Sequence, residues 1–215
     1  MIEKNVLLFW DKEPVPDGYA RAVLHIKDTL PGANIVSLND ATAALFLQDS
    51  YGARHRDAFE ACTLPAMRSD LIRLAWIARH GGLYVDWRYR PRSKVNVLFK
   101  NRFEDLTCYR LQIFKQPIIN NAIFLAPAGS PLLSQLRDAA FDNVFARKEG
   151  TVSALTGPDL FTRHVATLPA ERVKIFGRQY FFDTYFENAQ QGQHGFDKSH
   201  WFTQNIFGLS DLYRD

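Results

Sequence analysis

Apolar residues fall into short continuous runs separated by segments with helical spacing, a pattern typical of buried strands packed between helices. The predicted strands are residues 6–10, 35–38, 83–86, 121–126 and 173–176. The predicted helices are residues 19–30, 41–47, 57–62, 67–80, 131–145 and 158–167. Strands that alternate with helices in this way predict an α/β fold. No repeat or linker interrupts the sequence, so one domain over residues 1–215 is expected.

The composition narrows the class of protein. Of 215 residues, 47% are hydrophobic and 13% aromatic, so the chain can bury a sizeable core. The net charge of +3 is small and the charges are interspersed, which argues against nucleic acid as a partner. Cys62 and Cys108 lack metal-ligand spacing and are expected to be reduced core thiols. Without a signal-peptide pattern or an apolar span of ~20 residues, a cytoplasmic protein is expected.

The segment SDLIRLAWIARHGGLYVDWR, residues 69–88, gathers the candidate chemistry. It predicts a helix, a stop at Gly81 and a short strand that ends on Asp86. Side chains alternate along a strand, so Tyr84, Asp86 and, in an extended chain, Arg88 share one face. Ligands of α/β folds bind at the carboxyl ends of strands, where Asp86 is expected to lie.

Asp70 and Arg73 lie one turn apart on the helix that precedes this strand, among residues that are almost all apolar. Two interpretations remain open. In the first, Asp70 and Arg73 form a surface ion pair that contributes little stability, and Asp86 only forms hydrogen bonds with the turn that follows it. Alternatively, the charges are partly buried because a site uses them.

The segment carries S-D-x-x-R, then G-G-L-Y-V-D, and thereby resembles the signature of sugar transferases with a DXD motif. That family includes yeast mannosyltransferases, capsular polysaccharide synthesis proteins and the glucosylating clostridial toxins. Four more segments are similar to family blocks in the same order: VLLFWDKEPVP, INNAIFLAPAGSPLL, LTGPDLF and HGFDKSHW. The resemblance implies a GT-A fold, a Rossmann-like mixed sheet flanked by helices in a single domain.

The resemblance also implies roles for individual residues. Trp10 would stack on the base of a nucleotide-sugar, and Tyr84 would line the base and ribose pocket; core aromatics are the alternative for both. Asp70 would bond sugar hydroxyls, and Arg73 would reach the diphosphate or the sugar. Asp86, the first acid of the motif, would contact the ribose and the metal.

Further donor and metal positions follow from the same resemblance. Asn120 or Asn121 would face the donor, and Gly157 and Pro158 would lie in the loop beside the transferred sugar. In the C-terminal tail, His194, His200 and Trp201 would close the site. The two histidines would approach the metal and the phosphates. An ordinary helix start is the alternative for the loop, and solvated side chains are the alternative for the histidines.

Arg88 stands where the family has its second acid, a direct ligand of Mn²⁺ or Mg²⁺. Three explanations stay open: metal binds through Asp86, the diphosphate and tail residues; Arg88 replaces the metal; or catalysis has been lost. Arg90, Arg92 and Lys94 follow at alternate positions, which in an extended chain predicts a basic strip shared with Arg88, where a diphosphate or an anionic acceptor would bind; a solvated loop is the alternative.

The predicted function is that of a glycosyltransferase, hexosyltransferase-like, which moves a sugar from a UDP- or GDP-sugar to a glycan or other hydroxyl acceptor. The resemblance implies retention of anomeric configuration, and membrane-associated biosynthetic machinery is a candidate partner. One alternative is a non-catalytic nucleotide-sugar binding protein with a degenerate motif. Another is an α/β protein of unrelated function whose D-x-R is structural. A dinucleotide-binding enzyme is disfavoured because no G-x-G-x-x-G follows the first strand.

Overall fold

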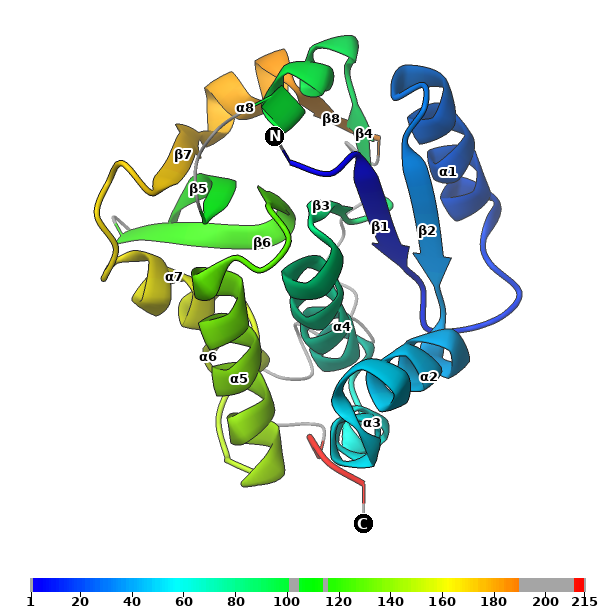
Figure 1. Cartoon of the computed structure of the whole chain (residues 1–215), viewed down its shortest axis with the longest axis vertical. Helices are drawn as coiled ribbons and strands as arrows, with labels where there is room; N and C mark the ends of the chain where they lie inside the picture. Colours follow the sequence, from blue (N-terminus) through cyan, green and yellow to red (C-terminus); the bar gives the residue numbers. More distant parts are fainter. Residues whose placement is uncertain (1, 101–104, 114–115, 190–210, 215) are drawn as a thin grey trace.

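A mixed sheet of six strands forms the centre of the computed structural model, which describes residues 2–100, 105–113, 116–189 and 211–214 (Figure 1). The strand order is β2-β1-β3-β6-β5-β7. The strands are β1 (Asn5–Phe9), β2 (Asn34–Leu38), β3 (Gly82–Val85), β5 (Leu106–Ile113), β6 (Gln116–Ala126) and β7 (Val173–Gly177). Strand β6 is antiparallel to both of its neighbours, whereas β1 is parallel to β2 and β3. A separate two-stranded sheet pairs β4 (Tyr89–Pro91) with β8 (Phe186–Asn188).

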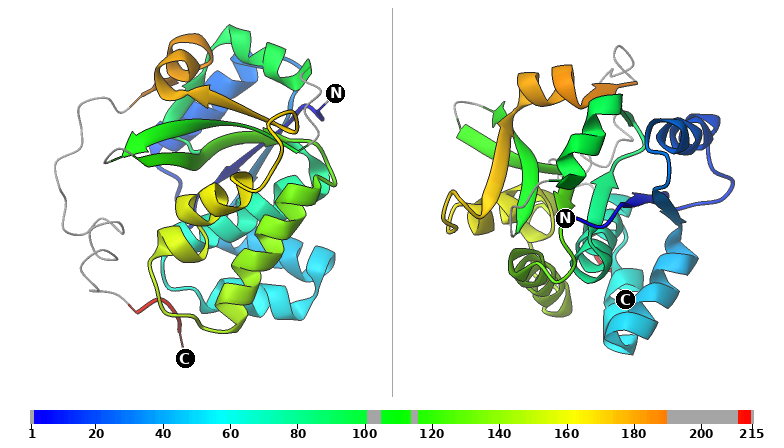
Figure 2. Two further views of the ribbon diagram at one scale, coloured as in Figure 1. Left: turned by 90° about the vertical axis from the view of Figure 1, so that its left-hand side faces the viewer. Right: turned by 45° about the horizontal axis from the view of Figure 1, so that its top comes forward.

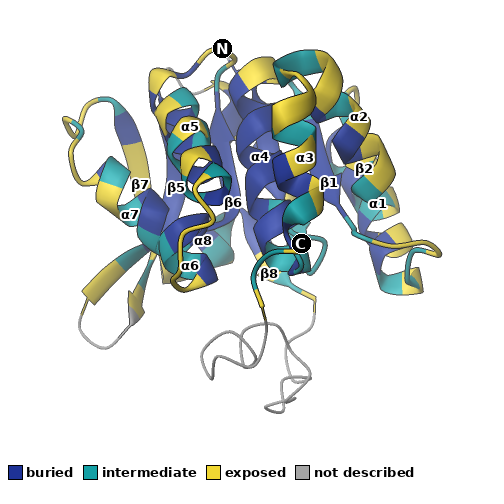
Figure 3. Cartoon of the chain, turned by 90° about the horizontal axis from the view of Figure 1, so that it is seen from below, coloured by how far each residue is buried: buried dark blue, intermediate teal, exposed yellow. Residues whose placement is uncertain are grey.

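Helices cover both faces of the sheet, so the molecule has three layers (Figure 2). One face carries α2 (Asp40–Tyr51), α3 (Ala53–Ala61), α4 (Pro65–His80), α5 (Pro131–Phe145), α6 (Val152–Leu155) and α7 (Pro158–Val165). The other carries α1 (Asp17–Thr29), the 3₁₀ helix η1 (Ser93–Lys100) and α8 (Arg178–Thr184). Helix α4 lies between α5 and α3 in the first layer (Figure 3). The α/β fold predicted from the apolar runs is confirmed.

Alternation along the central strands separates two hydrophobic cores. Leu7 of β1 and Tyr84 of β3 belong to the core beneath α4, whereas Leu8 and Leu83 belong to the core beneath α1 and η1. Because the side-chain period of a strand is two residues, each strand contributes to both cores. The face of β3 that carries Tyr84 therefore meets the helix that carries Asp70.

Two consecutive glycines join α4 to β3. Gly81 ends the helix with φ +65°, and Gly82 begins the strand with φ +114°. A Cβ atom on Gly82 would lie 2.4 Å from the carbonyl oxygen of Asn5, so β1 can approach only a glycine here. The turn fixes where β3 starts and therefore where it ends.

The sequence-based boundaries hold for most elements and fail for some. The capping residue of α2 is Asn39, whose side chain accepts from the Thr42 amide. Strand β5 was not predicted, because Arg110 and Gln112 interrupt its apolar pattern.

Both cysteines are free and buried, as expected. In the part of the chain that the structure describes, no helix combines the length and apolar character needed to cross a membrane.

Candidate functional site

Asp70 and Arg73 form an ion pair inside the core rather than on the surface. Each residue is only 5% exposed, and Arg73 Nη2 lies 3.4 Å from Asp70 Oδ1. Charges at this depth require partners, since their removal from water is costly. The interpretation as a surface ion pair is therefore wrong.

Asp70 joins three segments of the chain. Asn121 of β6 donates from Nδ2 to one carboxylate oxygen at 2.8 Å, and Thr156 donates from Oγ1 to the other at 3.0 Å. Gly157 lies so close that a Cβ atom there would be 3.1 Å from Asp70 Oδ2. Burial raises the pKa of Asp70 to about 6, against the opposing charge of Arg73 and the two hydrogen bonds.

The Arg73 guanidinium is fixed on all sides. It donates from Nε to the Ser69 carbonyl at 3.0 Å, from Nη2 to Ser69 Oγ at 2.6 Å, and from Nη1 to the Asn121 carbonyl at 2.7 Å. Its carbon lies 4.2 Å from the centre of the Tyr84 ring, a cation–π contact. These contacts leave the charge of Arg73 in place but give its side chain little freedom to move.

Hydrogen bonds then run from Arg73 to the end of β3. Ser69 Oγ lies 3.0 Å from the Tyr84 hydroxyl, which donates to Asp86 Oδ1 at 2.6 Å. Because the Tyr84 proton points to Asp86, Ser69 is the donor to Tyr84. Asp86 Oδ1 also lies 3.7 Å from Arg73 Nη2, and the Asp86 side chain is 22% exposed. The network therefore opens to solvent at Asp86.

Arg88 lies in a tight turn rather than in an extended chain. The Tyr89 amide donates to the Asp86 carbonyl at 2.9 Å, which closes the turn between β3 and β4. Arg88 is half-buried, and its Nε is buried without a hydrogen-bond partner among the described residues. Arg88 therefore follows Asp86 within the turn and does not continue the face of the strand.

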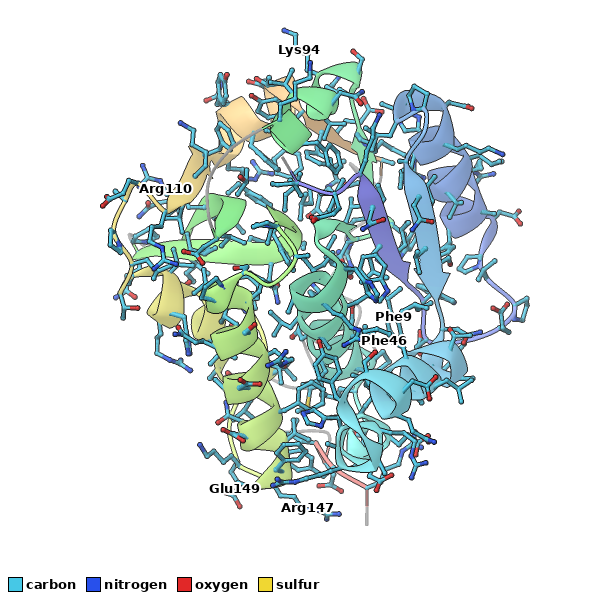
Figure 4. All side chains as sticks on the ribbon, in the orientation of Figure 1. Phe9, Phe46, Lys94, Arg110, Arg147 and Glu149 are labelled. Carbon is cyan, nitrogen blue, oxygen red and sulfur yellow. The ribbon has the colours of Figure 1, made fainter. Side chains whose placement is uncertain are left out.

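The predicted basic strip does not form, because tertiary contacts use two of its members. Arg90 donates to the carbonyl oxygens of Trp87 and Gly18. Arg92 donates to the carbonyls of Phe182 and Phe186 and pairs with Glu187, with Nη2 at 3.3 Å from the carboxylate. Lys94 belongs to η1 and points outward at the upper edge of the molecule in Figure 4. Of the four residues, Arg88 is the one that lies in the turn directly after Asp86.

Aromatic side chains gather where β1 ends. The half-buried Trp10 meets Trp87 edge to face, with ring centres 5.7 Å apart, and tilts against Tyr19 at 6.2 Å. Gly18 allows close packing, because a Cβ atom there would lie 3.0 Å from the Trp87 ring. Trp10 thus has an aromatic wall on the side of the turn that carries Arg88.

The two asparagines of β6 serve different faces. Asn121 is buried against Asp70, as described, whereas Asn120 accepts from the Tyr109 hydroxyl at 2.8 Å and from the Ala122 amide at 2.8 Å. The contacts with Asp70 and Arg73 distinguish Asn121 as the member of the network. Pro158 begins α7 directly after Gly157 and so fixes the direction in which the chain leaves Asp70.

A second buried arginine lies at the start of α4. Arg68 contacts Asp40 at 2.5 Å and Asp11 at 4.0 Å, and these acids follow β2 and β1. The ion pairs tie the carboxyl ends of both strands to the helix that carries Asp70. Arg68 therefore helps to hold the site together.

Three expected site residues, His194, His200 and Trp201, lie outside the described residues. Within the described ranges, no group of three or more His, Cys, Asp or Glu side chains could hold a metal ion. At the motif, Asp86 already accepts a hydrogen bond from Tyr84, and an arginine takes the place of the second acid. These described donors do not fit the several oxygen ligands that Mn²⁺ or Mg²⁺ requires.

Sequence reasoning gave no role to Ser69, Trp87 or Tyr109 and did not foresee the bond from Thr156 to Asp70. Ser69 directly precedes Asp70 in S-D-x-x-R, and Trp87 is the middle residue of D-W-R, so motif position was a signal for both. Tyr109 had none, because its strand was not predicted.

Comparison with known proteins bears on the family and the fold of the chain. Residues 16–104 match the family model of the glycosyltransferase sugar-binding region containing the DXD motif. No curated protein matches the chain. Among solved structures, the chain resembles the PaToxG glycosyltransferase (15% identity, TM-score 0.56, 99% of this chain and 89% of that one). It also resembles the catalytic domain of alpha-toxin from Clostridium novyi (10%, 0.50, 99% and 78%). The glycosyltransferase GlyE from Streptococcus pneumoniae is similar as well (12%, 0.51, 99% and 65%). At these identities the likeness shows the fold, which is GT-A.

Proposed function

We propose that this chain, whose residues 16–104 match the model of the DXD-containing glycosyltransferase family, transfers a sugar from a nucleotide-sugar to a hydroxyl acceptor. The observation that carries the proposal is the buried network from Asp70 through Arg73 and Tyr84 to Asp86. Such buried charges contribute little net stability, so their concentration at the carboxyl end of β3 favours a ligand site.

The donor would lie along the carboxyl ends of β1 and β3. Trp10, half-buried beside Trp87, suits a stacked base, and the exposed part of Asp86 suits a ribose or sugar hydroxyl. Asp70 is 5% exposed and both of its oxygens already accept hydrogen bonds. We therefore assign Asp70 mainly to positioning Arg73 and the Gly157 loop, and Asp86 to direct contact with the donor.

The reaction breaks the bond between the anomeric carbon and the diphosphate oxygen and forms a bond from that carbon to the acceptor oxygen. The bonding pair leaves with the diphosphate, and the acceptor proton passes to a phosphate oxygen in a front-face transfer with retention. A fixed guanidinium near the diphosphate would stabilise the charge that develops there. UDP- and GDP-sugars are the donors we expect, and a glycan or another hydroxyl compound is the acceptor.

A non-catalytic nucleotide-sugar binding protein is the second candidate, because Arg88 replaces the second acid of the motif. Both candidates predict a donor site at the same residues. Only the transferase predicts turnover of the bound donor.

A panel of UDP- and GDP-sugars tests the proposal, with release of UDP or GDP followed in the presence and absence of glycan acceptors. We expect one donor to turn over and Asp86→Asn to lower the rate by about 100-fold or more. Asp28→Asn, on the exposed face of α1, is the matched control and should retain the rate. Binding without turnover would favour the second candidate, and failure of every donor to bind would refute both.

A further inference from the structure

We infer that the guanidinium of Arg88, rather than a divalent cation, supplies the positive charge that holds the donor's diphosphate. The inference rests on the proposed function and concerns the same site. It begins with the chain itself, in which an arginine occupies the position of the second metal-binding acid two residues after Asp86. A cation therefore stands in the sequence where the family places a ligand for one.

The backbone holds Arg88 in a defined place. The bond from the Tyr89 amide to the Asp86 carbonyl closes the turn on one side of Arg88. On the other side, the Arg88 carbonyl accepts from the Ala189 amide at 2.9 Å, next to the pairing of β4 with β8. These bonds fix the backbone of Arg88 before the ligand arrives, which reduces the rearrangement needed to bring its charge to the ligand.

Arg88 differs from the neighbouring arginines in what it contacts. Arg73 and Arg92 pair with carboxylates, and Arg90 donates to two carbonyl oxygens. The structure gives the Arg88 guanidinium no ion pair or hydrogen bond to a described residue, and its Nε is buried. A buried N–H without an acceptor is unfavourable, which suits a group that receives an anionic ligand.

The surrounding charge favours an anion over a cation. Arg73 Nη2 lies 3.7 Å from Asp86 Oδ1, and Arg88 follows Asp86 in the same turn, so a divalent ion here would be repelled by Arg73 and would have a second arginine in the adjoining turn. Arg178, at the start of α8, adds a third positive charge. Burial and Asp86 raise the pKa of the half-buried Tyr89, whereas Arg88 and Arg178 both act to lower it. A diphosphate would meet this charge favourably, and the planar fork of arginine matches phosphate oxygens.

Calorimetric titration of the full chain with UDP and with GDP, in EDTA and in MnCl₂, tests the inference. The wild-type protein should bind one of them with the same affinity in both conditions. Arg88→Gln, which removes the charge and keeps most of the bulk, should weaken binding in EDTA by roughly 10- to 100-fold. Arg79→Ala, at the exposed far end of α4, is the matched control and should leave the affinity unchanged.

A second variant tests whether an acid at position 88 makes donor binding depend on a metal. Arg88→Asp restores D-x-D, so its binding should be lost in EDTA and recovered at least in part by Mn²⁺. Wild-type binding that requires Mn²⁺, or an EDTA affinity that Arg88→Gln leaves unchanged, would overturn the inference but not the proposed function. Absence of UDP and GDP binding in both conditions would overturn both, so the two failures can be told apart.

Discussion

Comparison of Asp70→Asn with the wild type should isolate the contribution of one carboxyl group to the pH dependence of folding stability. Burial raises the pKa of Asp70 from 3.8 to about 6, although Arg73 opposes the shift and Asp86 adds to it. Between these two values the folded protein binds a proton at Asp70 that the unfolded chain has released. The stability that this group contributes is therefore fully present below pH 3.8, the pKa in the unfolded chain. It is lost as the pH rises through about 6, the pKa in the folded protein.

The magnitude follows from the same two values. One pH unit corresponds to about 1.4 kcal/mol, so ionisation of Asp70 lowers the free energy of unfolding by about 3 kcal/mol in all, of which about 2.5 kcal/mol falls between pH 4 and pH 7. Asparagine has the same shape and no charge. Its oxygen can accept from Asn121, and its amide can donate to Thr156, whose hydroxyl can turn to the Val152 carbonyl at 3.3 Å.

Urea denaturation of the wild type and of Asp70→Asn at a series of pH values provides the assay. The difference between the two curves cancels every other titrating group that both proteins share. We expect the stability of the variant relative to the wild type to rise by about 2.5 kcal/mol from pH 4 to pH 7, while donor binding weakens because Arg73 loses its charged partner. Asp28→Asn makes the same charge change on the surface of α1 and serves as the control.

A flat difference curve would refute this reasoning. So would a curve in which the wild type gains stability relative to the variant as the pH rises. Either result would mean that the ion pair with Arg73 outweighs burial and keeps Asp70 ionised at little cost. The buried charges would then be a net source of stability, and the argument that a ligand site retains them would be weaker.

Two further substitutions test the hydrogen bonds and the backbone around the site. Tyr84→Phe removes the hydroxyl between Ser69 and Asp86. It should lower the free energy of unfolding in urea by about 1 kcal/mol and weaken donor binding measured by calorimetry. Unchanged donor binding would show that the orientation of Asp86 does not depend on Tyr84. Gly82→Ala places a Cβ atom against the Asn5 carbonyl at φ +114° and should cost about 3 kcal/mol or more in thermal or urea unfolding. Gly32→Ala, at φ +75° in open space, is its control and should cost only about 1 kcal/mol; equal effects at the two glycines would contradict the steric argument.

Local signals in the sequence were enough to predict the unit that carries the site. The apolar spacing of α4, the glycine stop and the alternation of β3 all depend on neighbours within a few residues. They placed Tyr84 and Asp86 on the face that meets Asp70 and Arg73, and the structure has them there. These site residues could be predicted from the sequence because one helix, one turn and one strand fix their spacing.

What the sequence could not provide depends on distant segments. The basic strip failed because Arg90 and Arg92 find acceptors on α1 and around β8, more than seventy residues away in the first case and about ninety in the second. The choice between Asn120 and Asn121 depends on how β6 pairs with β5, where the register shifts between Thr107 and Tyr109. Neither the acceptors nor the shift leaves a local pattern.

The carboxylate of Asp70 also couples the site to the folding of the whole chain. Its partners Asn121 and Thr156 are separated from it by 51 and 86 residues, so the three segments meet only when α4, β6 and the α6–α7 connection are all in place. A partly unfolded form that has lost any one of them has no donor site. Donor binding should therefore report on the population of the fully folded chain, and slow the hydrogen exchange of amides in α4 and β6 together.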